Sequence, residues 1–286
     1  MSEAYTSGKT HRDENFPVAS FLIHPKYRAT ILAFYRFARA ADDVADHATA
    51  SPDEKLTLLE SMRKSLTGEA QASSEAVALR TALAERNLSA EHALDLLEAF
   101  RRDVTKSRYA DWTELMEYCR YSAMPVGRFV LEVHGESRAL WPASDALCAA
   151  LQIINHLQDC AKDFRDLNRV YIPLDTFADV QALAGAKASP ALRKAIGGLA
   201  RRTMELLAQA KPFAGGIGDA RLALEVGVIQ RLAEDLARKL ETRDPLCERV
   251  HHGRSESVLL AASVLPGFAL SRLRSRKAPL ELAREK

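Results

Sequence analysis

Two pairs of aspartates stand four residues apart in helix-forming sequence. Asp42 and Asp46 lie in ADDVADH, and Asp159 and Asp163 lie in QDCAKD. On a helix, like charges at this spacing repel by roughly 0.2–0.5 kcal/mol per pair. A cation would offset the repulsion, and Mg²⁺ binds carboxylate oxygens together with the phosphate oxygens of a substrate. The pairs therefore indicate a site for Mg²⁺ and an anionic ligand, although solvent or a basic side chain could supply the positive charge instead.

Each pair extends a polar stripe along one face of a predicted helix. The first stripe has spacings of four, three and four, and it consists of Tyr35, Arg39, Asp42 and Asp46. The second has spacings of three, four and four, and it consists of Gln152, Asn155, Asp159 and Asp163. The residues flanking the second stripe are leucine, isoleucine and alanine, whereas a solvated face would carry lysine and glutamate more broadly. This pattern predicts a cavity lined by carboxylates from two helices. Surface helices with accidental pairs, or faces where Arg39 simply pairs with Asp42 or Asp43, remain the alternatives.

The elements that must position these stripes are helices. Apolar residues recur at spacings of three and four almost throughout, and alternation of period two is nearly absent, so the predicted fold class is all-α. The expected helices cover residues 25–47, a stretch beginning at Ser51-Pro52, and residues 74–87, 90–108, 112–134, 144–166, 189–210, 219–242 and 255–272. The GGIG at 215–218 is expected to be a turn. No linker-like run interrupts the pattern, so residues 1–286 are predicted to form a single domain.

Composition excludes several classes of function. Lys+Arg number 40 and Asp+Glu 38, so the net charge of +2 gives no support for a nucleic-acid-binding surface. The four cysteines form no Cys-x-x-Cys pair, which argues against a zinc site or a disulfide framework. The N-terminus lacks the apolar segment of a secretory signal, and the apolar run 258–270 is too short to span a membrane. We therefore expect a cytoplasmic protein. The apolar run precedes several arginines, so contact with the inner membrane face is a further hypothesis, with a core-packed helix as the favoured alternative.

The chain resembles the squalene/phytoene synthase family of head-to-head prenyl transferases. The resemblance rests on YRFARAADDVAD from Tyr35 to Asp46, the Gln152 to Asp163 array, Arg169-Val-Tyr171-Ile-Pro173, and YCRYSAMPVG at 118–127. It implies the terpenoid synthase fold with a central helix-lined cavity, and two or three Mg²⁺ ions that bind with a prenyl diphosphate. The implied metal ligands are Asp42, Asp46, Asn155, Asp159 and Asp163. The implied catalytic residues are Tyr35, Arg39, Gln152, Tyr121 and Tyr171, with Phe129 as a further aromatic that could stabilise a cation.

Within the family, the opening HRDENFPVASFLIHP looks most like the branch that makes hydroxysqualene in bacterial hopanoid gene clusters. That branch converts presqualene diphosphate to hydroxysqualene by water capture, so no NAD(P)H is expected. The resemblance implies a substrate-binding set of Asn15, Phe16, Ser20, Tyr35, Arg39, Tyr121, Gln152, Asn155 and Arg169. It also implies functional coupling to an enzyme that makes presqualene diphosphate and to an oxidoreductase that forms squalene. His156, beside the second stripe, is expected to be a core histidine.

Three other functions compete with this interpretation. A squalene or phytoene synthase would condense two prenyl diphosphates and use the same motifs. A head-to-tail prenyl diphosphate synthase would normally carry paired aspartates where Asp159 is followed by Cys160. A non-enzymatic helical binding protein would carry the acidic faces by chance.

Overall fold

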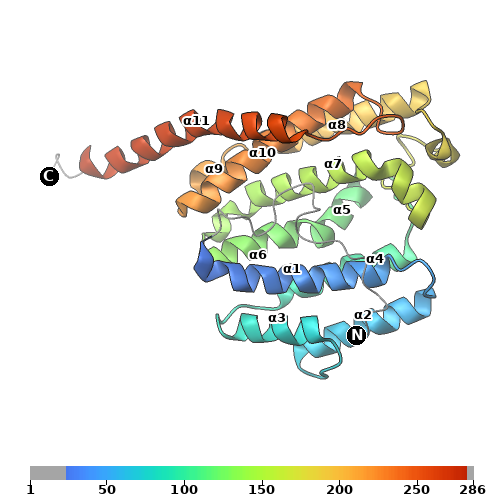
Figure 1. Cartoon of the computed structure of the whole chain (residues 1–286), viewed down its shortest axis with the longest axis horizontal. Helices are drawn as coiled ribbons and strands as arrows, with labels where there is room; N and C mark the ends of the chain where they lie inside the picture. The colour runs from blue at the N-terminus through green and yellow to red at the C-terminus, as the bar shows by residue number, and fades with distance from the viewer. Residues whose placement is uncertain (1–23, 282–286) are drawn as a thin grey trace.

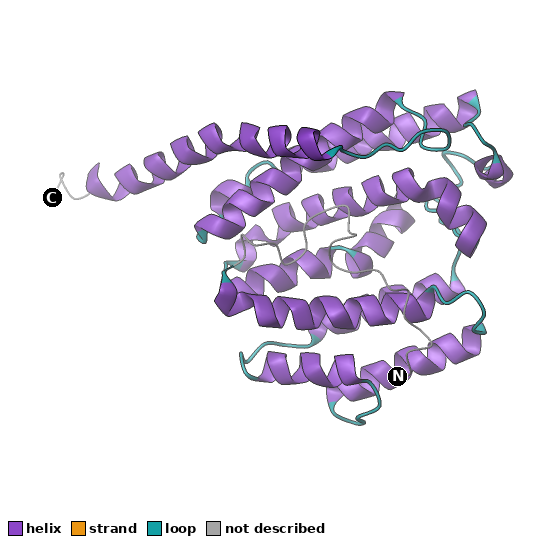
Figure 2. Cartoon of the chain, in the orientation of Figure 1, coloured by secondary structure: helices purple, strands orange, loops and turns teal. Residues whose placement is uncertain are grey.

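The computed structural model describes residues 24–281, and within the last helix it describes side chains as far as residue 270 and that of residue 272. All the elements in this range are helices, and the one pair of backbone segments that meet as in a sheet is the isolated bridge between Arg108 and Val170 (Figure 2). The all-α prediction is therefore confirmed. No helix in the described part of the chain is both long enough and apolar enough to cross a membrane.

The helices stack in layers (Figure 1). In chain order they are α1 (Pro25–Ala45), α2 (Pro52–Thr67), α3 (Ser74–Ala84), α4 (Glu91–Thr105), α5 (Trp112–Ser122), α6 (Met124–His134), η2 (Arg138–Leu140), α7 (Trp141–Leu167), η3 (Val180–Ala184), α8 (Pro190–Ala210), α9 (Phe213–Gly216), α10 (Ala220–Thr242) and α11 (Arg254–Glu281). Helix α1 packs on α2, α3, α4 and α6, whereas α7 packs on α5, α6, α8 and α10. Helix α6 therefore contacts both helices that carry the aspartate stripes.

Two apolar cores hold these layers together. The first lies among α1 to α4 and includes the fully buried Phe37 and Met62, together with Phe129 from α6. The second lies among α5 to α10 and is centred on α7 residues such as Ile153 and Ile154. Burying a large apolar side chain stabilises the fold by roughly 1.5–3 kcal/mol, so these cores fix α1 and α7 as walls.

Local signals set the ends of the helices. Helix α2 begins as predicted, because Ser51 and Glu54 form a reciprocal capping box and Pro52 occupies the first turn. The predicted single helix over 112–134 is wrong, since the chain breaks at Ala123 and restarts as α6 with Pro125 in its first turn. The GGIG segment is only partly a turn, because Gly215 and Gly216 end the short helix α9.

Candidate active site

The end of α1 carries an arginine-clamped acidic wall. Arg39 donates to Asp42 at 2.9 Å and to Asp43 at 2.7 Å, so it pairs with both carboxylates one turn further along the helix. Asp46 caps the end of α1, and its Oδ1 accepts from Arg169 Nη1 at 2.5 Å. We call Asp42 and Asp46 the α1 wall. Both of its carboxylates have an arginine partner before any ligand arrives.

The turn after α7 delivers Arg169 to this wall. Asn168 ends α7 in the left-handed conformation with φ 52°, and its side chain accepts from Arg108 at 2.7 Å. The turn directs the buried Arg169 toward α1 and α4. Its Nε donates to the carbonyl of Asp103 on α4 at 3.0 Å, and its Nη2 donates to the carbonyl of Ala45 at the end of α1 at 3.1 Å. The guanidinium thus satisfies a carbonyl at the C-terminus of α1, where positive charge is favoured. Arg169 fixes the position of Asp46 relative to α4 and α7.

The acidic wall on α7 is held more loosely. Asn155, Asp159 and Asp163 form this α7 wall. Asp163 approaches His156 Nδ1 at 3.7 Å, and no side-chain hydrogen bond or ion pair from the described residues reaches the Asp159 carboxylate. Gln152 contacts His156 Nε2 at 2.9 Å, and the imidazole stacks on Tyr171 with ring centroids 3.4 Å apart. His156, expected in the core, therefore lies in the wall beside the predicted ligands.

One cavity of about 310 Å³ joins the two walls. We call it the polar cavity, and its lining consists of Asp42, Asp46, Phe100, Asp103, Tyr118, Ser122, Gln152, Asn155, His156, Asp159, Asp163, Leu167, Arg169 and Tyr171. All five predicted metal ligands, together with Gln152, Arg169 and Tyr171, therefore face the same space. The walls come from α1 and α7, helices that are far apart in sequence.

The floor of the polar cavity contains a carboxylate that the sequence analysis missed. Asp103 on α4 accepts from the Tyr118 hydroxyl at 2.8 Å and from the Tyr171 hydroxyl at 2.9 Å. Burial raises the pKa of Asp103, while the adjacent Arg169 opposes the shift. Its place in the sequence could have revealed it, because Asp103 falls at helical spacing on the same face of α4 as the buried residues His92, Leu96 and Ala99. A charged residue at such a position demands partners.

Electrostatics distinguishes the unliganded cavity from an ordinary acidic surface. Burial and then repulsion from Asp46 raise the pKa of Asp42 to about 7, despite the opposing charge of Arg39. About a third of the Asp42 side chain stays accessible to the cavity, although surrounding protein screens it from bulk water. Burial and then repulsion from Asp163 also raise the pKa of Asp159. Both walls are therefore unfavourable places for negative charge until a cation approaches.

The donor set fits Mg²⁺ that is shared with an anionic ligand. The walls offer four carboxylates and one amide, all hard oxygen donors, and two of the carboxylates have raised pKa values that a cation would lower. In the described residues, no group of three His, Cys, Asp or Glu side chains is placed to hold a metal ion together. Mg²⁺ commonly binds one or two carboxylates plus phosphate oxygens.

A second cavity of about 270 Å³ follows along the same two helices. We call it the apolar cavity, and its lining consists of Ile31, Phe34, Tyr35, Ala38, Val126, Gly127, Phe129, Val130, Leu131, Ser144, Leu147, Cys148, Leu151, Phe213, Leu222, Glu225, Val226 and Ile229. Leu151 lines it while the next residue, Gln152, lines the polar cavity. Phe34 and Phe129 stack in its wall with centroids 3.9 Å apart. An acidic cavity and an apolar cavity thus lie one after the other along α1 and α7.

The apolar cavity depends on a close approach of α6 and α7. A Cβ placed at Gly127 would lie 2.3 Å from Ser144 Oγ and 2.6 Å from Cys148 Sγ. Both atoms are the ends of side chains, so a larger residue at position 127 would require Ser144 and Cys148 to shift, whereas glycine lets α6 and α7 lie this close without that rearrangement.

The other predicted residues are placed differently. Tyr35 lines the apolar cavity, one turn before Arg39. Tyr121 lines neither cavity, and its ring lies under the guanidinium groups of Arg102 at 4.1 Å and Arg120 at 4.4 Å. Its neighbour on α5, Tyr118, reaches the polar cavity instead. Asn15, Phe16 and Ser20 lie outside the described residues.

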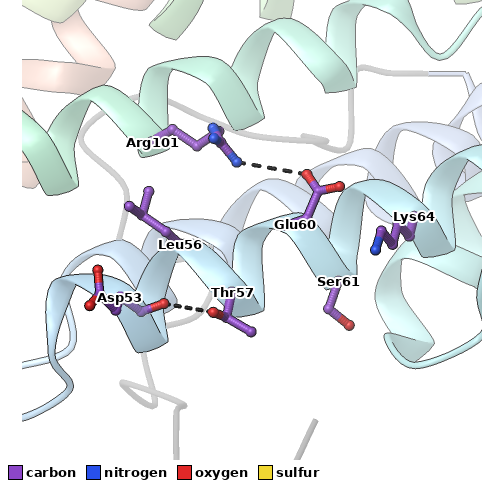
Figure 3. A pocket seen from close by; sticks show the side chains of 7 residues that line it. All are labelled: Asp53, Leu56, Thr57, Glu60, Ser61, Lys64 and Arg101. Carbon is purple, nitrogen blue, oxygen red and sulfur yellow. Dashed lines mark hydrogen bonds and ion pairs between the residues drawn. The ribbon is translucent and has the colours of Figure 1, made fainter.

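A third hollow, on α2 and α4, has none of these features. It is an open groove of about 630 Å³ lined by Asp53, Leu56, Thr57, Glu60, Ser61, Lys64 and Arg101 (Figure 3). Its polar contacts are those of a solvated surface, namely Arg101 to Glu60 at 3.7 Å and Thr57 Oγ1 to the Asp53 carbonyl at 2.8 Å. It shares no residue with the polar or the apolar cavity, so it adds nothing to the candidate site.

Sequence comparisons find known proteins that are similar to most of this chain. A family model described as squalene/phytoene synthase matches residues 9–256. The hydroxysqualene synthase of Rhodopseudomonas palustris is 60% identical over 249 residues, which cover 86% of this chain and 85% of that protein. The hydroxysqualene synthase of Zymomonas mobilis is 58% identical over 274 residues, which cover 94% of this chain and 92% of that protein.

Solved structures show the same architecture. The crystal structure of the squalene synthase HpnC from Alicyclobacillus acidocaldarius matches with a TM-score of 0.68 at 30% identity, over 78% of this chain and 86% of that chain. A dehydrosqualene synthase crystallised with a ligand matches with a TM-score of 0.73 at 19% identity, over 92% of this chain and 93% of that chain. The second match is a likeness of fold alone. Together they show the terpenoid synthase fold that the sequence resemblance implied.

Proposed function

Because the chain belongs to the squalene/phytoene synthase family, whose members process prenyl diphosphates, we propose that it is a hydroxysqualene synthase. It ionises presqualene diphosphate, rearranges the cation and adds water, releasing hydroxysqualene and diphosphate. The observation that carries this proposal is the pairing of the two cavities. Two facing acidic walls suit a metal-bound diphosphate, and the apolar cavity that follows suits a hydrocarbon chain.

The diphosphate head would lie in the polar cavity. Asp42, Asp46, Asn155, Asp159 and Asp163 would hold two or three Mg²⁺ ions, and this family generally uses divalent cations. When bound, Mg²⁺ supplies the Lewis acidity that neutralises charge developing on the leaving diphosphate. Arg39 and Arg169 would keep the α1 wall in place, because both pair with its carboxylates before substrate enters.

Ionisation leaves a cyclopropylcarbinyl cation that must rearrange before water reaches it. Gln152 lines the polar cavity and the preceding Leu151 lines the apolar cavity, so we propose that the reacting carbon lies beside these two residues. Apolar walls exclude bulk water, and the faces of Tyr35 and Phe129 would stabilise the cation by roughly 0.5–2 kcal/mol each. Water capture then ends the sequence without a hydride donor, so no nicotinamide cofactor is required.

The direct test supplies purified protein with Mg²⁺ and presqualene diphosphate, and omits NADPH. We expect hydroxysqualene and one equivalent of diphosphate. Absence of both products would disprove the proposal. Formation of presqualene diphosphate, squalene or phytoene from farnesyl or geranylgeranyl diphosphate would identify the alternative, a condensing synthase such as the squalene synthase and phytoene synthases that the chain resembles.

A thermal melt separates an enzyme from a non-enzymatic helical binding protein. Mg²⁺ together with a prenyl thiodiphosphate should raise the melting temperature of the wild type. The double variant Asp42→Asn, Asp159→Asn should show no shift. An equal shift in the double variant would mean that the acidic walls do not hold the ligand.

The chemistry of the substrate and the product also indicates which reactions precede and follow this one. A head-to-head condensation must supply the cyclopropyl diphosphate, and a reductive removal of the hydroxyl would yield the hydrocarbon. Substrate and product both carry long hydrocarbon chains, so we propose that the cytoplasmic enzyme works in contact with the inner face of the membrane. Mixing it with enzymes of those two classes should shorten the lag before squalene appears if the three are coupled.

A further inference from the structure

Helix α11 presents an unusual apolar surface. It packs on α10, and its C-terminal end projects beyond the other helices in Figure 1. Four large apolar side chains on it are exposed, Val258 at 67%, Leu259 at 72%, Leu265 at 50% and Leu270 at 51%. Elsewhere in the described residues, the most exposed large apolar side chains are those of Val126 at 41% and Leu174 at 37%. Exposed apolar side chains are therefore concentrated on this helix.

These side chains share one face. At 100° per residue, positions 258, 259, 262, 265, 266, 269 and 270 fall within an arc of about 140°. No charged residue lies anywhere between positions 258 and 270. Contiguous apolar faces of this kind mark interaction sites on proteins, whereas single exposed apolar residues need no explanation. We call the exposed residues Val258, Leu259, Leu265 and Leu270 the α11 face.

The opposite side of α11 is already occupied by protein. A Cβ placed at Gly227 of α10 would lie 3.2 Å from Val264 Cγ1, so the two helices approach closely. Phe268 packs against the second core, and Arg272 Nη2 donates to the Ile217 carbonyl at 2.9 Å. The α11 face therefore points away from the body, which holds it in a fixed orientation.

Positive charge follows directly after the apolar stretch. Residues 271–277 read SRLRSRK, which places four basic residues and no acidic one at the end of the exposed face. The helical backbone continues through this sequence to Glu281. An apolar helix face next to a basic cluster suits a membrane surface rich in anionic headgroups. The apolar side chains can pack among the acyl chains, and the basic side chains can bind the headgroup phosphates.

We propose that α11 docks the protein on an anionic lipid surface. This inference deepens the proposed function, on which it rests, by naming the contact surface and the lipid chemistry. A second copy of the chain is a less suitable occupant, since a parallel contact along α11 would bring two basic clusters together, and residues 258–270 offer the cluster no acidic partner in either direction. The α11 face inserts at the level of the acyl chains, and Arg274, Arg276 and Lys277 bind headgroup phosphates, while Arg272 stays bonded to the Ile217 carbonyl.

Docking in this orientation would place the greasy substrate beside the enzyme. Helix α10 carries Leu222, Val226 and Ile229 in the lining of the apolar cavity, and α11 packs directly on α10. Helix α10 therefore lies between α11, which carries the proposed lipid contact, and the apolar cavity. A hydrocarbon product would need to cross little water on leaving it.

The test is co-sedimentation of the full chain with lipid vesicles in the absence of substrate. Vesicles of phosphatidylcholine alone are compared with an equimolar mixture of phosphatidylcholine and phosphatidylglycerol. The apolar variant Leu259→Ser, Leu270→Ser should lower the partition coefficient at least about tenfold. The basic variant Arg274→Gln, Arg276→Gln, Lys277→Gln should remove the preference for anionic vesicles, at roughly fivefold per residue. The matched control Leu174→Ser removes an exposed leucine elsewhere and should bind like the wild type.

Two further measurements keep the result decisive. Circular dichroism should be unchanged in every variant, and turnover of detergent-dispersed presqualene diphosphate should match the wild type. Unchanged vesicle binding in the apolar variant would overturn the proposal. So would a wild-type dimer that becomes monomeric in that variant, because the α11 face would then be a contact between copies. Because vesicle binding is measured without substrate, its failure is distinct from a failure of the enzymatic proposal.

Discussion

The two acidic walls of the polar cavity have the same spacing of aspartates but different support. On α1, Asp42 pairs with Arg39 at 2.9 Å and Asp46 with Arg169 at 2.5 Å. On α7, within the described part of the chain, the Asp163 carboxylate has an ion-pair partner only in His156 at 3.7 Å, and the Asp159 carboxylate has no hydrogen-bond or ion-pair partner. One wall is therefore fixed by the protein itself. The carboxylates of the other have no arginine partner among the described residues, although the second core holds the backbone of α7 in place. Incoming cations should therefore add more to the stability of the α7 wall than to that of the α1 wall.

Removing Arg169, which holds Asp46 in the α1 wall, should give the largest loss in the free energy of unfolding. Arg169→Met removes the buried guanidinium that pairs with Asp46 and donates to the carbonyls of Ala45 and Asp103, and leaving a buried polar group without its partner costs roughly 1–3 kcal/mol. The matched control Lys162→Met breaks the exposed pair with Asp166 on α7, which should cost less than about 1 kcal/mol. Urea unfolding measures both. Equal losses would show that Arg169 does not stabilise the wall in this way.

The α7 wall should respond to ligand more than the α1 wall. Mg²⁺ with a prenyl thiodiphosphate should slow amide hydrogen exchange about tenfold or more over residues 155–163, because ligation lowers the local opening of the α7 wall. Residues 39–46 should change little. Asp159→Asn should abolish the protection on α7 without altering the unligated exchange rates. Equal protection of both walls would contradict the contrast between them.

The unliganded protein should lose stability as pH rises. The folded pKa of Asp42 is about 7 against an ordinary value of 3.8, so the folded state holds a proton that the unfolded state has released. The free energy of unfolding should therefore fall by about 1 kcal/mol between pH 5 and pH 8, after allowing for the accessible part of the side chain. Asp42→Asn should flatten this dependence. Mg²⁺ with the thiodiphosphate should also flatten it, because cations lower the pKa. A stability that rises over this range would show that Asp42 stays charged.

The smallest expected loss, of stability and of kcat, distinguishes two neighbouring tyrosines on α5. Tyr118→Phe removes a hydroxyl that donates to the buried Asp103, and it should cost about 1 kcal/mol of stability and lower kcat. Tyr121→Phe keeps a ring that arginines cover outside both cavities, so it should leave kcat unchanged. Steady-state kinetics with presqualene diphosphate distinguishes them. A greater loss of kcat in Tyr121→Phe would restore the role that the sequence resemblance implied.

Local patterns in the sequence were sufficient for the helices and for the two stripes. Ser51, Pro52 and Glu54 predicted the start of α2 because a capping box is a local interaction. The break between α5 and α6 was also readable, since Pro125 cannot continue a helix interior, but strong apolar periodicity on both sides concealed it. Spacing placed Asp42 and Asp159 on the correct faces.

Tertiary contacts explain what the sequence could not show. Asp103 has no acidic partner at helical spacing, and its role depends on hydroxyls from Tyr118 and Tyr171, which come from other parts of the chain. Tyr121 lies three residues beyond Tyr118 on α5, yet cationic neighbours on α4 and α5 hold its ring outside the cavity. Which of two neighbouring tyrosines faces a cavity depends on the packing of helices, and no local pattern encodes it.

The glycine at the crossing of α6 and α7 has a consequence for how this enzyme can diverge. A Cβ at position 127 would meet Ser144 Oγ and Cys148 Sγ on the facing helix, so both side chains would have to turn away before a larger residue could fit there. A substitution at Gly127 would therefore reshape the hydrocarbon pocket through Ser144 and Cys148, which line it as well. Selection for a shorter or longer product meets no such contact at other lining positions, such as Val126 or Leu147.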